Sequence, residues 1–153
     1  MRVVACLRFL KGKRRELTFA TGEYMRTPWG ESDSRIKVQD GVYWVGTPSH
    51  GGFMVALGVA KTYLTQQARE KAEVCCGYLC FEEDCLASIV LFEHPELFDA
   101  VGIVNRGAEE LFESLSFWEF DYLLARGIEP EAGSYARGKE SRAEMEAHFH
   151  RVA

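Results

Sequence analysis

The first third of the chain carries its apolar residues in short runs rich in valine and phenylalanine, which favour β-strands. These runs predict five strands, at residues 3–10, 14–20, 35–39, 42–45 and 53–57. Asp40-Gly41 separates the third run from the fourth, and this dipeptide is a strong signal of a hairpin turn. We therefore expect an antiparallel sheet of about five strands in residues 1–57, with residues 21–34 forming a loop.

Beyond this region the apolar residues recur at helical spacing among alanine, glutamine, lysine and glutamate, which favour helices. We expect helices at residues 59–74, 82–92 and 107–125, and a short turn at residues 96–98. Thr65 marks a point where the first helix divides in two. His94-Pro95 ends the second helix because proline restricts the residue before it, and Gly127 ends the third.

The C-terminal region predicts a linker followed by one short helix. Residues 129–139 contain proline and glycine, which interrupt regular structure. Ser141 and Glu144 form a capping box, the pattern that begins a helix, and we expect this last helix to reach about His150.

These elements predict one α+β domain over residues 1–153, an amino-terminal antiparallel sheet with three to four helices packed on one face. We expect residues 1–57 to be mainly strands and residues 58–128 to be mainly helices. Residues 129–153 hold the linker and the short terminal helix. No apolar run approaches the roughly 20 residues of a membrane-spanning helix. The basic run at residues 11–15 follows an apolar segment instead of preceding it, unlike a secretory signal, so we expect a cytoplasmic protein without a membrane partner.

Charge is distributed unevenly along the chain, whose formal net charge is −5. Residues 1–38 carry nine Lys and Arg against four Asp and Glu, whereas residues 82–131 carry thirteen Asp and Glu against two arginines. An acidic surface repels the phosphate backbone, so we expect no direct nucleic-acid binding. The asymmetry favours a partner with a basic surface, or pairing between the two halves of the chain.

The predicted helix at residues 107–125 carries acidic and aromatic side chains suited to a partner. Acidic residues lie in its first turns, and its aromatic residues are of the kind enriched at interfaces. The candidates for partner binding are Glu109, Glu110, Glu113, Phe117 and Phe120. The apolar arc of this helix is also wide enough for a place in the core, or for pairing with a second copy as a homodimer.

The stretch Thr47–Gly52 has the composition of a functional loop, since it places His50 among glycines between two strands, and imidazole titrates near neutral pH. Glu82, Glu83 and Asp84 offer carboxylates for acid–base chemistry or for a hard metal ion. His50 with Glu83 or Asp84 is therefore the candidate catalytic centre. The structural alternatives are a turn shaped by its glycines, and acids that complement the dipole of a first helical turn.

Five cysteines, odd in number and unevenly spaced, are typical of a reducing compartment. They are Cys6, Cys75, Cys76, Cys80 and Cys85. Their spacing matches no zinc template, so we expect buried, reduced thiols and name no metal ligand and no cofactor. Acidic neighbours raise a thiol pKa, which makes Cys85 a weak candidate nucleophile.

Five short blocks stand out together between residues 25 and 100. They are Thr27-Pro28-Trp29-Gly30, Asp40-Gly41-Val42, Thr47-Pro48-Ser49-His50-Gly51-Gly52-Phe53, Phe81-Glu82-Glu83-Asp84-Cys85 and Pro95-Glu96-Leu97-Phe98. This set resembles an uncharacterised domain family of proteins encoded by bacteria, phages and plasmids. The family has no established activity, so the resemblance assigns no catalytic residue. It implies a small accessory protein of a mobile element, concerned with overcoming host defences.

Three functions follow from these observations. We favour a non-enzymatic protein that inhibits a host defence nucleoprotein complex, such as CRISPR-Cas, because carboxylates could enter a groove that evolved for phosphates. The first alternative is a small hydrolase or nuclease centred on His50 with Glu83 and Asp84. The second is a structural homodimer built on the helix at residues 107–125.

Overall fold

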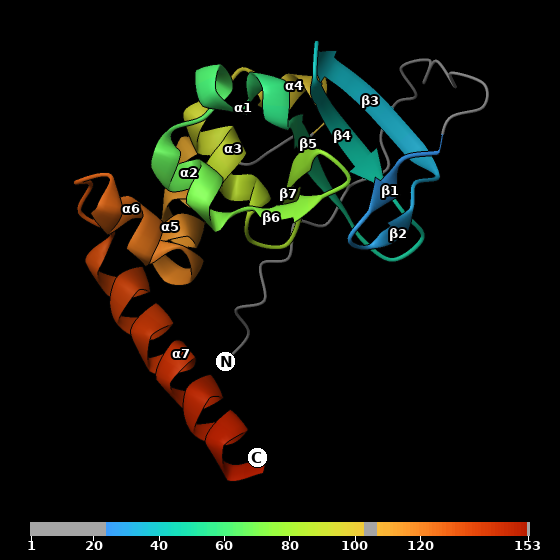
Figure 1. Ribbon diagram of the computed structural model, residues 1–153. Helices are drawn as coiled ribbons and strands as arrows, with labels where there is room; N and C mark the ends of the chain where they lie inside the picture. Colours follow the sequence, from blue (N-terminus) through green and yellow to red (C-terminus); the bar gives the residue numbers. More distant parts are fainter. Residues whose placement is uncertain (1–23, 103–106, 153) are drawn as a thin grey trace.

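Two antiparallel sheets are present in the computed structural model, which describes residues 24–102 and 107–152 (Figure 1). The strands are β1 (Arg26–Thr27), β2 (Gly30–Glu31), β3 (Ser34–Gln39), β4 (Val42–Gly46), β5 (Gly51–Ala56), β6 (Glu73–Cys75) and β7 (Tyr78–Glu82). The first two form a small hairpin, and the others form a five-stranded sheet in the order β3-β4-β5-β7-β6. The predicted α+β class is therefore confirmed.

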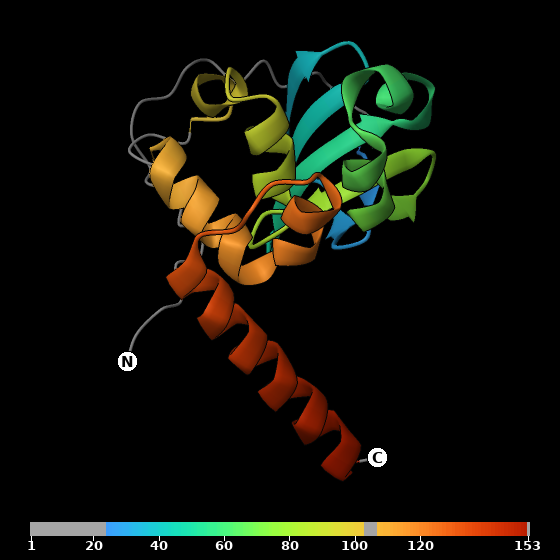
Figure 2. The same cartoon turned by 90° about the vertical axis from the view of Figure 1, so that its left-hand side faces the viewer.

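Helices pack against one face of the larger sheet (Figure 2). In the described part of the chain they are α1 (Leu57–Tyr63), α2 (Gln66–Lys71), α3 (Ala87–Glu93), α4 (Leu97–Ala100), α5 (Ala108–Trp118), α6 (Phe120–Ala125) and α7 (Ala132–Val152). Their number exceeds the predicted three to four. Two of the predicted helices are each divided in two, and the segment predicted as a turn at residues 96–98 forms part of α4.

Alternate residues of the strands face the helices. Along β5, Phe53 and Val55 belong to the large core cluster that also contains side chains of α1, α3, α5 and α6. Met54, between them, belongs to a smaller cluster with Val45 and Cys80. This alternation is the period of a β-strand. Strand β5 is buried along almost its whole length because it lies between β4 and β7.

The hairpin at Asp40-Gly41 is confirmed. Gly41 has a φ of +77°, which glycine adopts readily, and it joins the paired strands β3 and β4. The predicted strands at 35–39, 42–45 and 53–57 correspond to β3, β4 and β5, whereas those at 3–10 and 14–20 lie outside the described residues. The expected loop at 21–34 is wrong in part, since β1 and β2 lie within it.

Strands β6 and β7 occupy segments that the sequence assigned partly to helices. The predicted helix at 59–74 ends at Lys71, and the predicted helix at 82–92 begins only at Ala87. Cys76 and Gly77 both have positive φ and form the turn between the two strands. The Cys-Gly pair is not a usual hairpin signal, and the short apolar run Tyr78–Phe81 is compatible with a strand or a helix, so the sequence pattern predicts no hairpin here.

The two divided helices have different causes. Thr65 caps α2, because its hydroxyl accepts a hydrogen bond from the Ala68 amide at 3.2 Å, and the predicted division at Thr65 is confirmed. The predicted single helix at 107–125 is wrong, since Glu119 interrupts it with a φ of −123°. Glu119 is buried, and its carboxylate pairs with Lys71 at 2.7 Å, which holds α6 against α2.

Helix α7 replaces the predicted linker at 129–139 and the predicted short helix that begins at Ser141. The Glu131 carboxylate caps it by accepting hydrogen bonds from the amides of Gly133 and Ser134, at 3.0 and 2.6 Å. A hydrogen bond with the Ser134 side chain, together with these two amide bonds, lowers the pKa of Glu131 to about 2. The C-terminal part of α7 projects beyond the rest of the molecule (Figures 1 and 2). None of the described helices is long and apolar enough to cross a membrane.

Gly138→Ala is expected to weaken the packing of α7 on α5. A Cβ atom at Gly138 would lie 2.1 Å from the Phe117 carbonyl oxygen, and overpacking of this kind costs about 1–3 kcal/mol. Urea denaturation followed by tryptophan fluorescence measures the loss. Gly58→Ala in α1 is the control, since its Cβ meets no atom within 4 Å and the change is expected to stabilise by up to about 1 kcal/mol. Equal effects in the two variants would contradict close packing at Gly138.

Candidate functional site

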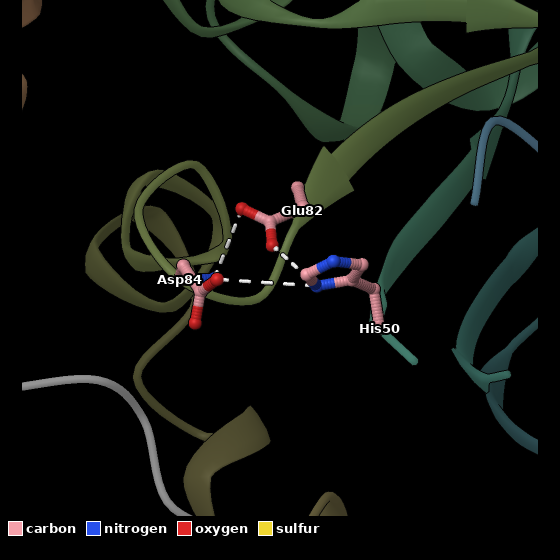
Figure 3. Close-up of side chains that lie close together, drawn as sticks. All are labelled: His50, Glu82 and Asp84. Carbon is pink, nitrogen blue, oxygen red and sulfur yellow. Dashed lines mark hydrogen bonds and ion pairs between the residues drawn. The ribbon is translucent and has the colours of Figure 1, made fainter. Parts of the chain in front are cut away.

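His50, Glu82 and Asp84 lie close together at the ends of two paired strands (Figure 3). His50 is the last residue before β5, and Glu82 is the last residue of β7. The strands pair antiparallel with Gly52 opposite Glu82, so the start of β5 lies beside the end of β7. Asp84 follows in the turn before α3. The pairing therefore assembles side chains that are far apart in the sequence.

Thr47 fixes the backbone from which His50 projects. The Thr47 hydroxyl donates to the His50 carbonyl oxygen at 2.8 Å and accepts from the His50 amide at 3.1 Å. The Thr47 amide donates to the same carbonyl oxygen at 2.7 Å. These three hydrogen bonds close a four-residue turn and leave the imidazole free to face β7.

Gly51 and Gly52 allow the start of β5 to approach its neighbours closely. A Cβ atom on Gly52 would lie 2.1 Å from the Phe81 carbonyl oxygen, and one on Gly51 would lie 2.8 Å from the Val45 carbonyl oxygen. Only glycine fits such an approach of two backbones. The two glycines thus act at the start of a strand and not in the turn that the sequence suggested, and the same approach brings His50 beside Glu82.

The three side chains form a small polar cluster that is open to solvent. His50 Nδ1 lies 3.4 Å from Glu82 Oε1 and 3.9 Å from Asp84 Oδ2. The Asp84 amide donates to the other oxygen of Glu82 at 3.2 Å, which orients that carboxylate (Figure 3). The side chain of His50 is 49% exposed and that of Glu82 is 22% exposed. The cluster is therefore accessible from solvent.

Glu82, and not Glu83, completes this cluster. Consecutive residues of a strand point in opposite directions, and the Glu83 carboxyl is turned toward the backbone of Gly51. The Glu83 amide donates to the Gly51 carbonyl oxygen at 2.9 Å. Of the predicted catalytic candidates, His50 and Asp84 thus meet, whereas Glu83 does not join them. The strand register that selects Glu82 is invisible in the sequence.

The carboxyls of this region repel one another. Burial raises the pKa of Glu82 above its usual value, and the carboxyl of Asp84 raises it further, whereas His50 lowers it. Burial and Asp84 also raise the pKa of Glu83. Because each ionised carboxylate disfavours the ionisation of its neighbour, a cation bound here would be stabilised.

The cluster has the composition of a metal site. Each of its three residues offers one donor atom, and these atoms lie within 4.8 Å of one another. In residues 24–102 and 107–152 no other group of three or more histidine, cysteine or acidic ligands meets this condition. Imidazole nitrogen with carboxylate oxygen suits zinc, manganese or iron. The sequence offers the carboxylates of Glu82 and Asp84 for a hard metal ion but does not single out His50 as a ligand beside them, because strand pairing is what brings the three together.

One family of proteins, a domain of unknown function (DUF7007), matches residues 22–150. The chain belongs to the DUF7007 family. No curated protein and no solved structure matches it. The match confirms an uncharacterised domain family and extends beyond the resemblance at residues 25–100, since it includes α7.

Part of the negative charge of this DUF7007 chain is neutralised internally. Arg126 Nη1 lies 2.9 Å from Glu93 Oε1, and the side chain of Glu93 is only 7% exposed. Lys71 Nζ lies 2.7 Å from Glu119 Oε2 and 3.0 Å from Asp121 Oδ2. These three acids pair with basic residues of neighbouring segments, so they hold the helical layer together. The buried side chains of Glu93 and Glu119 do not contribute to an outward-facing acidic patch.

The acidic candidates for partner binding have a different environment. Glu109, Glu110 and Glu113 are all exposed, on the first turns of α5. Negative charge there is stabilised by the positive end of the helix dipole. These residues of the DUF7007 domain are therefore accessible to a partner.

The aromatic candidates contact α7. The Phe120 ring packs edge-on against Tyr135, with ring centroids 5.1 Å apart, and the Arg142 guanidinium lies 4.1 Å from the Phe120 centroid. The backbone of Phe117 lies against Gly138. The Phe120 ring is thus engaged by the C-terminal helix of the same chain, whereas Phe117 contacts that helix through its backbone and its ring packs on Trp118.

The apolar stripe of α5 faces the core of the DUF7007 domain. Leu111 and Leu115 are buried, as is Tyr122 on α6. Trp118, on the same stripe, is 36% exposed. The wide apolar arc of this helix allowed a position in the core, and that prediction is confirmed.

The cysteines differ in their exposure. Cys80 is buried, Cys75 and Cys85 are half-buried, and Cys76 is exposed in the turn between β6 and β7. The expectation of buried thiols is therefore wrong for Cys76, while Cys6 lies outside the described residues. Burial raises the pKa of Cys85 to about 11, so this thiol is protonated at neutral pH and is a poor nucleophile.

Glu82→Gln is expected to stabilise the metal-free DUF7007 domain at neutral pH. Because the pKa of Glu82 is raised on folding, the folded state holds this proton more tightly than the unfolded chain does, and stability falls as pH rises through the folded pKa. The amide removes this loss, with a gain of about 1 kcal/mol or less for a partly exposed carboxyl.

Urea denaturation at a series of pH values, in the presence of a chelator, measures this gain. Glu140→Gln on α7, where the side chain is exposed, is the matched control and is expected to change little. A Glu82→Gln variant that is less stable than wild type at neutral pH would contradict the assignment.

Proposed function

We propose that the protein binds one divalent metal ion through His50, Glu82 and Asp84 and uses it to hydrolyse a phosphoester. The observation that carries this proposal is the meeting of three donor atoms from two paired strand ends within 4.8 Å. The proposal keeps His50 and Asp84 from the hydrolase interpretation of the sequence and replaces Glu83 by Glu82.

The distances within the cluster support a shared cation. Donor atoms bound about 2.1 Å from one ion lie roughly 3–4 Å apart around a tetrahedral or octahedral centre. His50 Nδ1 already lies 3.4 Å from Glu82 Oε1 and 3.9 Å from Asp84 Oδ2. Small side-chain rotations are therefore sufficient to bring all three atoms to one ion.

Three protein ligands leave coordination positions open for water and substrate, as in catalytic zinc sites. His50, Glu82 and Asp84 would hold the ion, and the two carboxylates would balance its charge. A bound divalent ion would supply Lewis-acid chemistry, polarising the phosphoester and acidifying a water that would displace the leaving alcohol, with the alcohol taking up a proton from solvent. The exposure of His50 fits a large substrate whose phosphate alone enters the cluster.

Metal binding tests the proposal directly. Isothermal titration of the reduced, metal-free protein with Mn²⁺ is expected to show one site. His50→Ala, Glu82→Gln and Asp84→Asn are each expected to weaken it by at least about tenfold. Hydrolysis of bis(p-nitrophenyl) phosphate is expected to require the ion and to fall in the same three variants.

Glu83→Gln is the matched control, because Glu83 is the neighbouring carboxyl that faces Gly51. It is expected to weaken Mn²⁺ binding and hydrolysis less than the three cluster variants do, because Glu83 supplies no ligand atom and adds only to the local negative charge. Unchanged Mn²⁺ affinity in the three cluster variants would refute the site, and Mn²⁺ binding without hydrolysis would limit the protein to metal binding.

The exposed acids of α5 favour a second function. We propose that Glu109, Glu110 and Glu113 form an acidic surface that binds the basic groove of a host defence nucleoprotein complex, such as CRISPR-Cas. Their exposure supports this interpretation, as does the ability of clustered charge to accelerate association with an oppositely charged partner.

Charge reversal tests the acidic surface. The triple change of Glu109, Glu110 and Glu113 to lysine is expected to abolish capture of a partner from host lysate at low salt, because attraction becomes repulsion. The same change of Glu140, Glu144 and Glu146, which are exposed on α7, is the matched control and is expected to retain capture. Equal capture by both variants would contradict the surface.

A further inference from the structure

Cys75 and Cys76 place two thiols at the tip of the hairpin between β6 and β7. Cys75 ends β6 and pairs with Tyr78 at the start of β7, so Cys76 and Gly77 form a two-residue turn. Their φ values are +51° and +84°, and positive φ at both positions is the signature of a type I′ turn. The two Sγ atoms lie 3.6 Å apart.

The turn itself does not explain the presence of Cys76. The first central position of a type I′ turn favours asparagine, aspartate or glycine, and a positive φ costs other residues roughly 1–2 kcal/mol. The turn is also anchored, since the Leu57 amide donates to the Gly77 carbonyl oxygen at 3.0 Å. The fold thus keeps the exposed Cys76 thiol on a fixed backbone in spite of a conformational cost. This indicates that the thiol itself has a chemical role.

We propose that Cys75 and Cys76 form a binding site for trivalent arsenicals and related metalloid compounds with two exchangeable oxygen ligands. Each thiol replaces one oxygen ligand: a sulfur–arsenic bond forms, an arsenic–oxygen bond breaks, and the thiol proton leaves with the oxygen as water. With phenylarsine oxide, two thiols and one oxide oxygen yield two sulfur–arsenic bonds and one water. Arsenic stays trivalent, so the step needs no oxidant or reductant.

The spacing of the sulfur atoms fits one shared centre. At 3.6 Å they are well beyond the roughly 2.05 Å of a disulfide bond. They are close to the roughly 3.8 Å that separates two sulfurs with 2.3 Å bonds to one tetrahedral ion. The geometry thus suits a ligand that bridges the two thiols.

The number of sulfurs favours such a centre over zinc. Zinc sites use three or four protein ligands, and the part of the chain that the structure describes gathers no third such ligand at this pair. The hydrogen bond between the two thiols raises the pKa of Cys75, so the pair is not set up as the two thiolates that zinc requires. Condensation with loss of water proceeds from protonated thiols.

The other described thiols are less available. Burial raises the pKa of Cys80 to about 12 and that of Cys85 to about 11. Neither is exposed, in contrast to Cys76. The site is also independent of the metal cluster at His50, which shares no residue with it.

The test adds one equivalent of phenylarsine oxide to the reduced full-length protein, then excess glutathione, and measures the intact mass. The wild-type protein is expected to retain one adduct with the mass of the reagent less one water, and to release it to dimercaptopropanol. Cys75→Ser and Cys76→Ser are expected to hold the arsenical about 100-fold less tightly against glutathione, because a single thiol loses the gain from two linked bonds.

Two sets of variants separate binding from folding. Cys76→Asn suits the turn and is expected to preserve or raise the free energy of unfolding while it abolishes adduct retention. Cys6→Ser, Cys80→Ser and Cys85→Ser are expected to retain the adduct. Release of the wild-type adduct to glutathione, retention by Cys76→Asn, or loss in any of these three controls would overturn the assignment.

Discussion

Strand β5 can lie beside β7 in its observed register only because Gly52 has no side chain, since a Cβ atom there would meet the Phe81 carbonyl oxygen at 2.1 Å. That register places Phe53 opposite Phe81 and commits both rings to the core under the helices. It also sets His50 beside Glu82. One backbone contact thus determines both the centre of the core and the composition of the candidate site. The same segments of the sequence therefore serve core packing and the chemistry of the site.

Local signals in the sequence predicted local structure well. Asp40-Gly41 gave the hairpin and Thr65 gave the helix cap, because each acts through hydrogen bonds or backbone angles within a few residues. The choice between Glu82 and Glu83 depended on the register of two strands separated by two helices and a third strand, which no local pattern contains. Gly138 misled for a related reason: it was expected to interrupt structure, whereas it allows α7 to approach the Phe117 backbone.

The acidic residues behind the charge asymmetry of the chain are of two kinds, buried and paired or exposed. Glu93 and Glu119 are buried and paired with Arg126 and Lys71, and removal of one partner from such a pair leaves a costly buried charge. A binding partner therefore cannot compete for these carboxylates without disrupting the helices. These pairs remove two of the thirteen acids of residues 82–131 from recognition. An acidic interface therefore depends on exposed acids, such as those at the start of α5.

The two proposed sites lie at opposite ends of β7. Its interior residues Leu79, Cys80 and Phe81 are buried, which makes the strand a rigid support. The metal cluster includes its last residue, Glu82, and the dithiol turn precedes its first, Tyr78. Five strand residues span roughly 17 Å, too far for one ion to touch both sites. Each site also has a local cost, carboxyl repulsion at Glu82 and a positive φ at Cys76. A protein tolerates such local costs where a well-packed element fixes the backbone on which they occur. The buried strand β7, paired on both sides, fixes the backbone at both of its ends.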